Sequence, residues 1–164
     1  MTRDSTRKSS QTKSERLEQF AFWLITATLA IYFSGGILPP LLHLIGLDTL
    51  GDLFFAAYSH TCHQIPERSF LLCDTQFGLC ARCLGFYGGL LMGAIYCTVK
   101  RGYSGPPPLL VLGMSLIMLA DVAFSLSPDN RSGNWFRLAL ALPTGFLLAA
   151  WAMAKLRASS RESS

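Results

Sequence analysis

Four long stretches of the chain carry almost no charged side chains, and this constrains its fold more than any other feature. They run over residues 20–47, 75–99, 106–127 and 135–154. A helix of a soluble protein keeps a polar face, whereas a helix that crosses a bilayer needs about 20 mostly apolar residues. Of the 164 residues, 51% are hydrophobic and 15% are charged. The sequence therefore predicts an all-α, polytopic membrane protein with about four transmembrane helices.

The first of these stretches is longer than one crossing requires. It contains a Gly-Gly pair at 35–36 and a Pro-Pro pair at 39–40. Proline removes a helical hydrogen bond, so we expect the first crossing to end or bend sharply there. The following residues, 41–58, are expected to form an interfacial helix in the first outer loop.

Basic side chains gather on one side of the predicted four-crossing arrangement. They are Arg3, Arg7, Lys8, Lys13, Arg16, Lys100, Arg101, Lys155, Arg157 and Arg161. By the positive-inside rule that side is the cytoplasm, so we expect a multi-pass protein of the cell (inner) membrane with both termini cytoplasmic. Residues 1–18 are expected to form a disordered basic tail, 19–156 the membrane domain and 157–164 a second cytoplasmic tail. The basic residues behind the net charge of +4 thus serve to orient the chain in the membrane, and no nucleic-acid partner is expected.

Cysteine and histidine cluster in the first outer loop and the start of the second crossing. Four of the five cysteines and two of the three histidines lie within 24 residues. A C-x-x-C pair and a second short Cys/His pair can supply the four ligands of a tetrahedral zinc-like site. The preferred ligands are Cys62, His63, Cys80 and Cys83, with His60 and Cys73 as alternates.

A redox role is the main alternative to metal binding. In an oxidising compartment Cys62 with Cys73, and Cys80 with Cys83, could form disulfides. A thiol-disulfide oxidoreductase that uses a membrane quinone would resemble the bacterial disulfide-forming oxidases, which carry a second cysteine pair in their other outer loop. Residues 127–134 contain no cysteine, which argues against this alternative. Cys97, alone near the inner end of its helix, is expected to be an ordinary buried thiol.

Polar residues inside the later helices lie on the same side as the cysteines. An ion pair between Asp121 and Arg137 is the simplest structural reading, because unpaired charges in a membrane are costly. The functional reading is a polar pocket in which arginines bind an anionic group such as a lipid phosphate. Its expected members are Gln64, Arg68, Arg82, Tyr87, Asp121, Arg131, Asn134 and Arg137.

Small residues recur every four positions in the second crossing, at Gly85, Gly89 and Gly93. Such a stripe lets another helix approach closely. The neighbour can belong to this chain or to another membrane protein, so a scaffold or accessory subunit of a membrane complex is a third functional interpretation.

Several motifs recur together with fixed spacing. They are Cys-His-Gln at 62–64, Pro-Glu-Arg-Ser-Phe at 66–70, Cys-Ala-Arg-Cys-x-Gly-x-Tyr-x-Gly at 80–89 and Arg-Ser-x-Asn-x-x-Arg at 131–137. Together they resemble the family of small predicted membrane proteins called domain of unknown function 2085. The resemblance covers about residues 50–150 and implies a multispanning membrane protein whose shared polar residues form a site of unknown activity. No nucleophile elbow or phosphate loop is present, so no catalytic residue is assigned.

Overall fold

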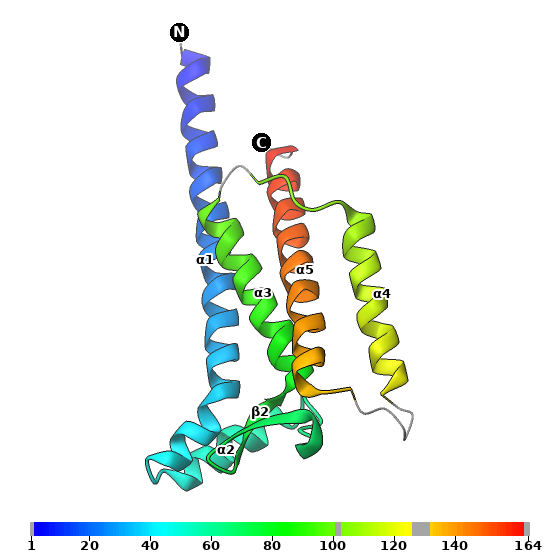
Figure 1. Cartoon of the computed structure of the whole chain (residues 1–164). Helices are drawn as coiled ribbons and strands as arrows, with labels where there is room; N and C mark the ends of the chain where they lie inside the picture. Colours follow the sequence, from blue (N-terminus) through cyan, green and yellow to red (C-terminus); the bar gives the residue numbers. More distant parts are fainter. Residues whose placement is uncertain (1, 101–102, 126–131, 163–164) are drawn as a thin grey trace.

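Four long helices stand side by side, with smaller elements at one end of them (Figure 1). The computed structural model describes residues 2–100, 103–125 and 132–162, and their side chains over 15–100, 103–125 and 132–160. The long helices are α1 (Thr2–Leu44), α3 (Ala81–Val99), α4 (Pro108–Phe124) and α5 (Asn134–Glu162). The short helix α2 (Asp48–Tyr58), a 3₁₀ turn (Pro66–Arg68) and a two-stranded hairpin lie together at what we call the hairpin end. Helix α1 begins and α5 ends at the opposite end.

Three of these helices are long and apolar enough to cross a membrane. Their apolar segments are Glu15–Leu44, Ala81–Val99 and Asn134–Ser160. Helix α4 has 17 residues, and at a rise of ~1.5 Å per residue it is about 26 Å long, slightly less than a hydrocarbon core of ~30 Å. The expected, mainly helical architecture is therefore confirmed with three candidate membrane-spanning helices, and a fourth crossing stays a prediction.

Helix α1 continues through the glycine and proline pairs and ends at Leu44. A helix end at 39–40 is therefore wrong, and the expected alternative, a sharp bend there, stays a prediction. The interfacial helix α2 is shorter than the predicted 41–58. Gly35 and Gly36 instead allow close packing, because a Cβ on either would meet Tyr58 or Leu79. Helix α1 also includes residues 2–18, where the composition predicts a disordered tail.

A β-hairpin corrects the expectation of an all-α chain. Strand β1 (Ser69–Leu72) pairs antiparallel with β2 (Thr75–Cys80), in the register Leu71 to Gln76 and Leu72 to Thr75. The two turn residues between the strands, at 73–74, have positive φ of 48° and 62°. The second crossing therefore starts at Ala81 and not at residue 75. A short apolar run is ambiguous between strand and helix by periodicity alone, which is why the sequence did not reveal β2.

Helices α3 and α5 form the closest pair of long helices. A Cβ on Gly85 would lie 2.7 Å from the carbonyl oxygen of Leu138, and one on Gly93 would lie 2.6 Å from that of Phe146. The glycine stripe of α3 is thus covered by α5 of the same chain. The expectation that this face docks other membrane proteins is corrected, because no room is left for a second helix.

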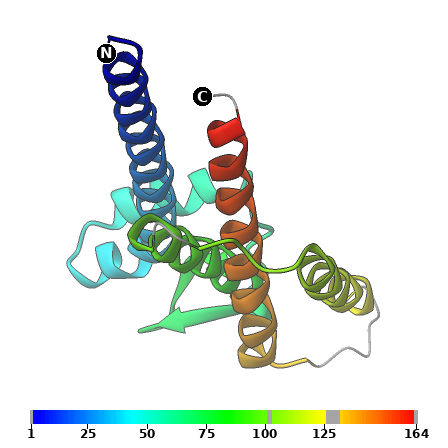
Figure 2. The same cartoon turned by 90° about the horizontal axis from the view of Figure 1, so that it is seen from above.

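Helix α4 stands farther out, with α5 as its main helical neighbour (Figure 2). Many of its large apolar side chains are exposed, as a lipid-facing helix requires. Its link to α3 is mainly polar and lies near the hairpin end, which brings it into the candidate site.

Candidate metal centre and its polar neighbours

Three cysteines from three different elements meet at the hairpin end. Cys62 lies in the loop after α2, Cys80 ends β2, and Cys83 lies in the first turn of α3. Their sulfur atoms all lie within 4.8 Å of one another. The backbone N–H of Cys80 donates a hydrogen bond of 3.2 Å to the sulfur of Cys62. The loop, the hairpin and α3 are therefore held together around a cluster of thiols, and no disulfide joins them.

An aromatic and apolar shell surrounds this thiol cluster. Cys62 is 3% exposed and packs with Tyr58 and Leu79, which are also buried. The ring of Tyr32 lies 5.0 Å from that of Tyr58 and 4.6 Å from that of Tyr87, measured between centroids. Tyr87 therefore belongs to the thiol cluster's shell and not to the arginine pocket in which the sequence placed it. Such a shell limits access of water to the sulfurs.

Hydrogen bonds among the three cysteines give their thiols different pKa values. The thiols of Cys80 and Cys83 donate to Cys62, and these hydrogen bonds hold the pKa of Cys62 well below its ordinary value. The same interaction with Cys62 raises the pKa of Cys80. Because a thiolate, not a thiol, is the metal ligand, a first negative charge at Cys62 forms readily, and a bound cation would favour loss of the remaining protons.

The other predicted ligands lie apart from the three sulfurs. His60, His63 and Cys73 are all exposed. Neighbouring residues point in different directions, so burial of Cys62 turns His63 outward. Cys73 lies at the hairpin turn, at the far end of β2 from Cys80. Within the described part of the chain, the sulfurs of Cys62, Cys80 and Cys83 form the one group of three or more closely spaced ligand atoms.

Gln64 stabilises the loop that carries Cys62. It adopts a positive φ of 49°. Its side-chain amide donates to the backbone carbonyl oxygens of Phe55 at 2.7 Å and Gly78 at 3.0 Å. The backbone carbonyl oxygen of Gln64 accepts a hydrogen bond of 2.7 Å from the side-chain amide of Gln76. Gln64 thus joins α2, the loop and the hairpin, and it does not line the arginine pocket that the sequence assigned to it.

Arg82 and Asp121 form an ion pair that joins α3 to α4. The Nε of Arg82 donates to a carboxylate oxygen of Asp121 at 2.9 Å, and its Nη2 donates to the hydroxyl of Ser125 at 2.8 Å. Both charged side chains are largely buried, at 14% and 9% exposure. The ion pair expected between Asp121 and Arg137 is therefore wrong, because Arg82 takes the carboxylate. Ser125, which the sequence reading did not include, lies four residues after Asp121 on the same helix face.

The remaining polar residues connect the 3₁₀ turn to the end of α4, and the hairpin to the start of α5. Arg68 donates to the carbonyl oxygen of Ser125 at 2.8 Å. Asn134 donates to the carbonyl of Ser69 at 3.0 Å and accepts a bond of 3.2 Å from Arg137. Ser69 is a further residue that the sequence analysis did not assign to the site, although it belongs to the Pro-Glu-Arg-Ser-Phe motif at 66–70. Arg131, also predicted here, lies outside the described residues.

Comparison with known proteins matches these residues to one family. The family described as a predicted membrane protein, DUF2085, matches residues 62–151, which include all three clustered cysteines and the arginine pocket. This chain belongs to the DUF2085 family. The predicted resemblance is therefore confirmed, and with it the membrane character of the chain.

Two curated relatives of this DUF2085 protein are themselves uncharacterized. An uncharacterized protein of Methanocaldococcus jannaschii is 46% identical over 48 residues, which are 29% of this chain and 31% of that protein. An uncharacterized protein of Methanothermobacter thermautotrophicus is 30% identical over 93 residues, or 56% of this chain and 84% of that protein. The match thus spans less than a third of the first relative. No solved structure matches the chain.

Proposed function

We propose that this DUF2085 protein holds a zinc-like metal ion on Cys62, Cys80 and Cys83. The observation that carries the proposal is the meeting of three sulfurs within 4.8 Å. Tetrahedral zinc with Zn–S bonds of ~2.3 Å separates its sulfurs by about 3.8 Å, so adjustments below about 1 Å would seat the ion. A disulfide would instead need sulfurs ~2.05 Å apart and would leave the third thiol unused.

The metal would join three separate elements. Cys62 comes from the loop after α2, Cys80 from β2 and Cys83 from α3. A bound ion would thus clamp the hairpin onto the long helices, and its binding free energy would add to the stability of the fold.

The fourth coordination position has two candidate occupants. His63 follows Cys62 directly but is exposed, so it would have to turn inward to complete the tetrahedron. His60 and Cys73 would require larger loop movements. Otherwise a water molecule or a substrate takes the position, which is the arrangement of catalytic zinc sites. We favour His63, and metal retention by His63→Ala would assign the position to water instead.

The site is proposed to lie at the non-cytoplasmic surface of the cell membrane. Helix α1 begins and α5 ends at the end opposite to the hairpin, next to Lys100 and Lys155. The positive-inside rule then places that end in the cytoplasm, with α4 as the fourth crossing. Reporter fusions in the loops 59–68 and 126–133 test this. Both should report the non-cytoplasmic side, and opposite sides would contradict the topology.

Metal analysis of the detergent-purified full chain tests the centre itself. The wild-type chain should retain about one ion per chain, and Cys62→Ser, Cys80→Ser and Cys83→Ser should each lose most of it. Cys73→Ser and Cys97→Ser are the matched controls, because Cys73 is exposed outside the cluster and Cys97 is buried elsewhere. Absence of metal from wild type, or equal loss in the controls, would refute the proposal.

The same preparations separate the rival functions. A thiol oxidoreductase would form a reversible Cys80–Cys83 disulfide with quinone as the electron acceptor, and non-reducing alkylation would detect it. A scaffold subunit would co-purify with a fixed partner at constant ratio. The scaffold interpretation has lost its main support, since α5 covers the glycine stripe.

An anionic lipid is the proposed neighbour of the centre. The arginine residues beside the hairpin carry the positive charge that binds such a headgroup. The exposed apolar faces of the long helices would contact the acyl chains of the same lipids.

A further inference from the structure

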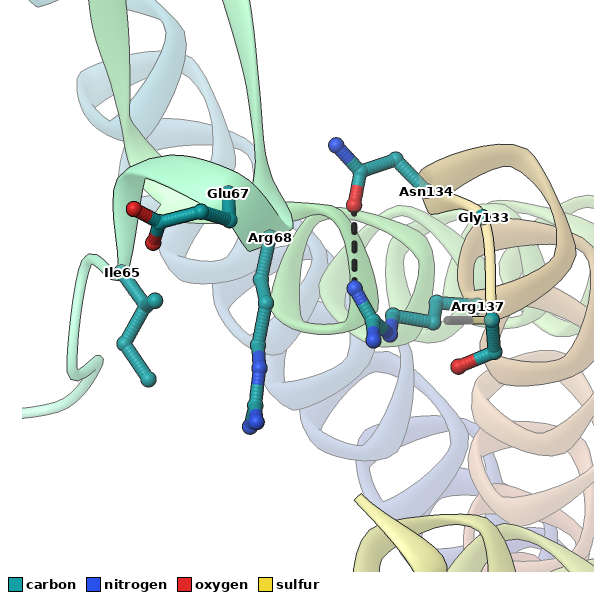
Figure 3. A pocket seen from close by; sticks show the side chains of 7 residues that line it. Ile65, Glu67, Arg68, Gly133, Asn134 and Arg137 are labelled. Carbon is teal, nitrogen blue, oxygen red and sulfur yellow. Dashed lines mark hydrogen bonds between the residues drawn. The ribbon is translucent and has the colours of Figure 1, made fainter. Parts of the chain in front are cut away.

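A cavity of about 570 Å³ lies between the 3₁₀ turn and the beginning of α5 (Figure 3). Arg68 lines it from the hairpin side, and Asn134 and Arg137 line it from α5. It is distinct from the thiol cluster, since none of the three clustered cysteines lines it. Arg82 and Asp121, which the sequence assigned to one pocket with Arg137, are absent from its lining because they bind each other.

Arg137 is the most unusual residue of this cavity. Its side chain is 4% exposed. One guanidinium nitrogen donates to Asn134, but among the described residues its Nε has no hydrogen-bond partner. Arg137 also forms no ion pair with any residue of the described ranges. A buried guanidinium without a counter-charge is costly, so this one is placed to receive an anion.

The surroundings of Arg137 are positive. Arg68 and Arg82 lie close enough to repel its charge, and the nearby carboxylate of Asp121 is already bound by Arg82. The N-terminus of α5 also opens on the cavity at Gly133 and Asn134, and its partial positive charge and N–H groups favour anions.

Among the residues that the structure describes, Glu67 is the one carboxylate of the lining. It is exposed, and in Figure 3 its carboxylate points away from the guanidinium groups of Arg68 and Arg137. It therefore does not neutralise the two arginines. Each guanidinium group already donates one hydrogen bond, from Arg68 to Ser125 and from Arg137 to Asn134, and its other nitrogens are left for a ligand in the cavity.

We propose that this cavity binds a phosphate group, with Arg137 and Arg68 as its two guanidinium ligands. Guanidinium matches the oxygens of phosphate in a bidentate geometry. Trp135 is next to Asn134 in the sequence and is 75% exposed, as is typical of an aromatic residue at the membrane interface. At the interface, both the phosphate of a lipid headgroup and a free phosphate compound can reach the cavity. Phosphate is thus the ligand class that we assign to the polar residues next to the metal centre. This assignment rests on the proposed function, which places the cavity at the membrane surface.

Thermal unfolding of the metal-loaded full chain, purified in phospholipid-free maltoside, tests the site. One arm titrates inorganic phosphate against chloride at equal ionic strength. A second arm titrates dihexanoyl phosphatidylglycerol against dihexanoylglycerol, which lacks the phosphate. Stabilisation by either phosphate compound over its control is the expected result. Stabilisation by the lipid alone assigns a headgroup, and stabilisation by inorganic phosphate alone assigns a soluble compound.

Three variants locate the effect. Arg137→Gln and Arg68→Gln should each weaken phosphate binding at least ~10-fold, as loss of a charge-assisted hydrogen bond predicts. Lys155→Gln removes one positive charge at the opposite end and should bind as wild type does. If Arg137→Gln fails to fold, Arg68→Gln and Asn134→Asp, which adds a carboxylate to the cavity, carry the test.

The proposal is overturned if neither compound stabilises the wild-type chain, or if both arginine variants keep wild-type affinity. Metal content is measured on the same samples. A chain that holds metal but binds no phosphate refutes the cavity alone, and a chain that binds phosphate without metal refutes the centre alone.

Discussion

Replacing Gly85 by alanine tests the close approach of α3 and α5 that supports both sites. Gly85 lies two residues after Cys83 and faces α5 one residue after Arg137, at Leu138. The added Cβ would lie 2.7 Å from the carbonyl oxygen of Leu138 and 3.1 Å from the Cβ of Ala141. Ordinary contact starts at 3.4 Å, so the two helices would have to separate by about 0.7 Å.

The expected energies follow from this crowding. Overpacking of a tight interface costs ~1–3 kcal/mol, while alanine in place of glycine favours a helix by ~1 kcal/mol. Gly85→Ala should therefore lower the free energy of unfolding by ~0–2 kcal/mol. Gly113→Ala in α4 is the matched control, because no atom lies within 4 Å of its added Cβ. That variant should gain ~1 kcal/mol.

Unfolding by sodium dodecyl sulfate in mixed detergent micelles, followed by circular dichroism, measures both variants against wild type. Gly85→Ala should be less stable than Gly113→Ala by ~1–3 kcal/mol. Equal stabilities would refute the close packing of α3 on α5. Metal content of the two variants, measured in parallel, shows whether the separation of the helices reaches the cysteines.

Three further results are expected. In the metal-loaded chain, iodoacetamide should modify the exposed Cys73 well before Cys62, and removal of the metal by a chelator at the same slightly alkaline pH should speed the modification of Cys62 while leaving that of Cys73 unchanged, as mass spectrometry can measure; a Cys62 rate that does not respond to the chelator would contradict the metal centre. Arg82→Gln and Asp121→Asn should each cost ~3–5 kcal/mol and the double variant less than their sum, so additive effects in a double-mutant cycle would contradict the buried pair. Arg157→Gln should lower the melting temperature without changing metal content, because Arg157 bonds backbone carbonyls at the end opposite to the hairpin.

Local patterns were enough to predict the helices and the cysteine cluster. Runs of apolar residues long enough for a bilayer identified α1, α3 and α5. Close spacing in the chain also brought Cys80 and Cys83 together, because residues three apart at the start of a helix are neighbours. Cys62 joins them from the loop after α2, where it begins the Cys-His-Gln motif at 62–64.

Choices between chemically similar partners could not be made this way. The sequence indicated Arg137 as the partner of Asp121, but the packing of α3 beside α4 brings Arg82 to the carboxylate instead. The exclusion of His63 from the thiol cluster follows from the direction of its side chain, which the order of residues does not specify. The hairpin formed where an apolar run fits strand and helix alike. Hydrophobicity and spacing act within a segment and can be read along the chain, whereas ion pairing, side-chain direction and the cavity at Arg137 depend on which segments meet in space.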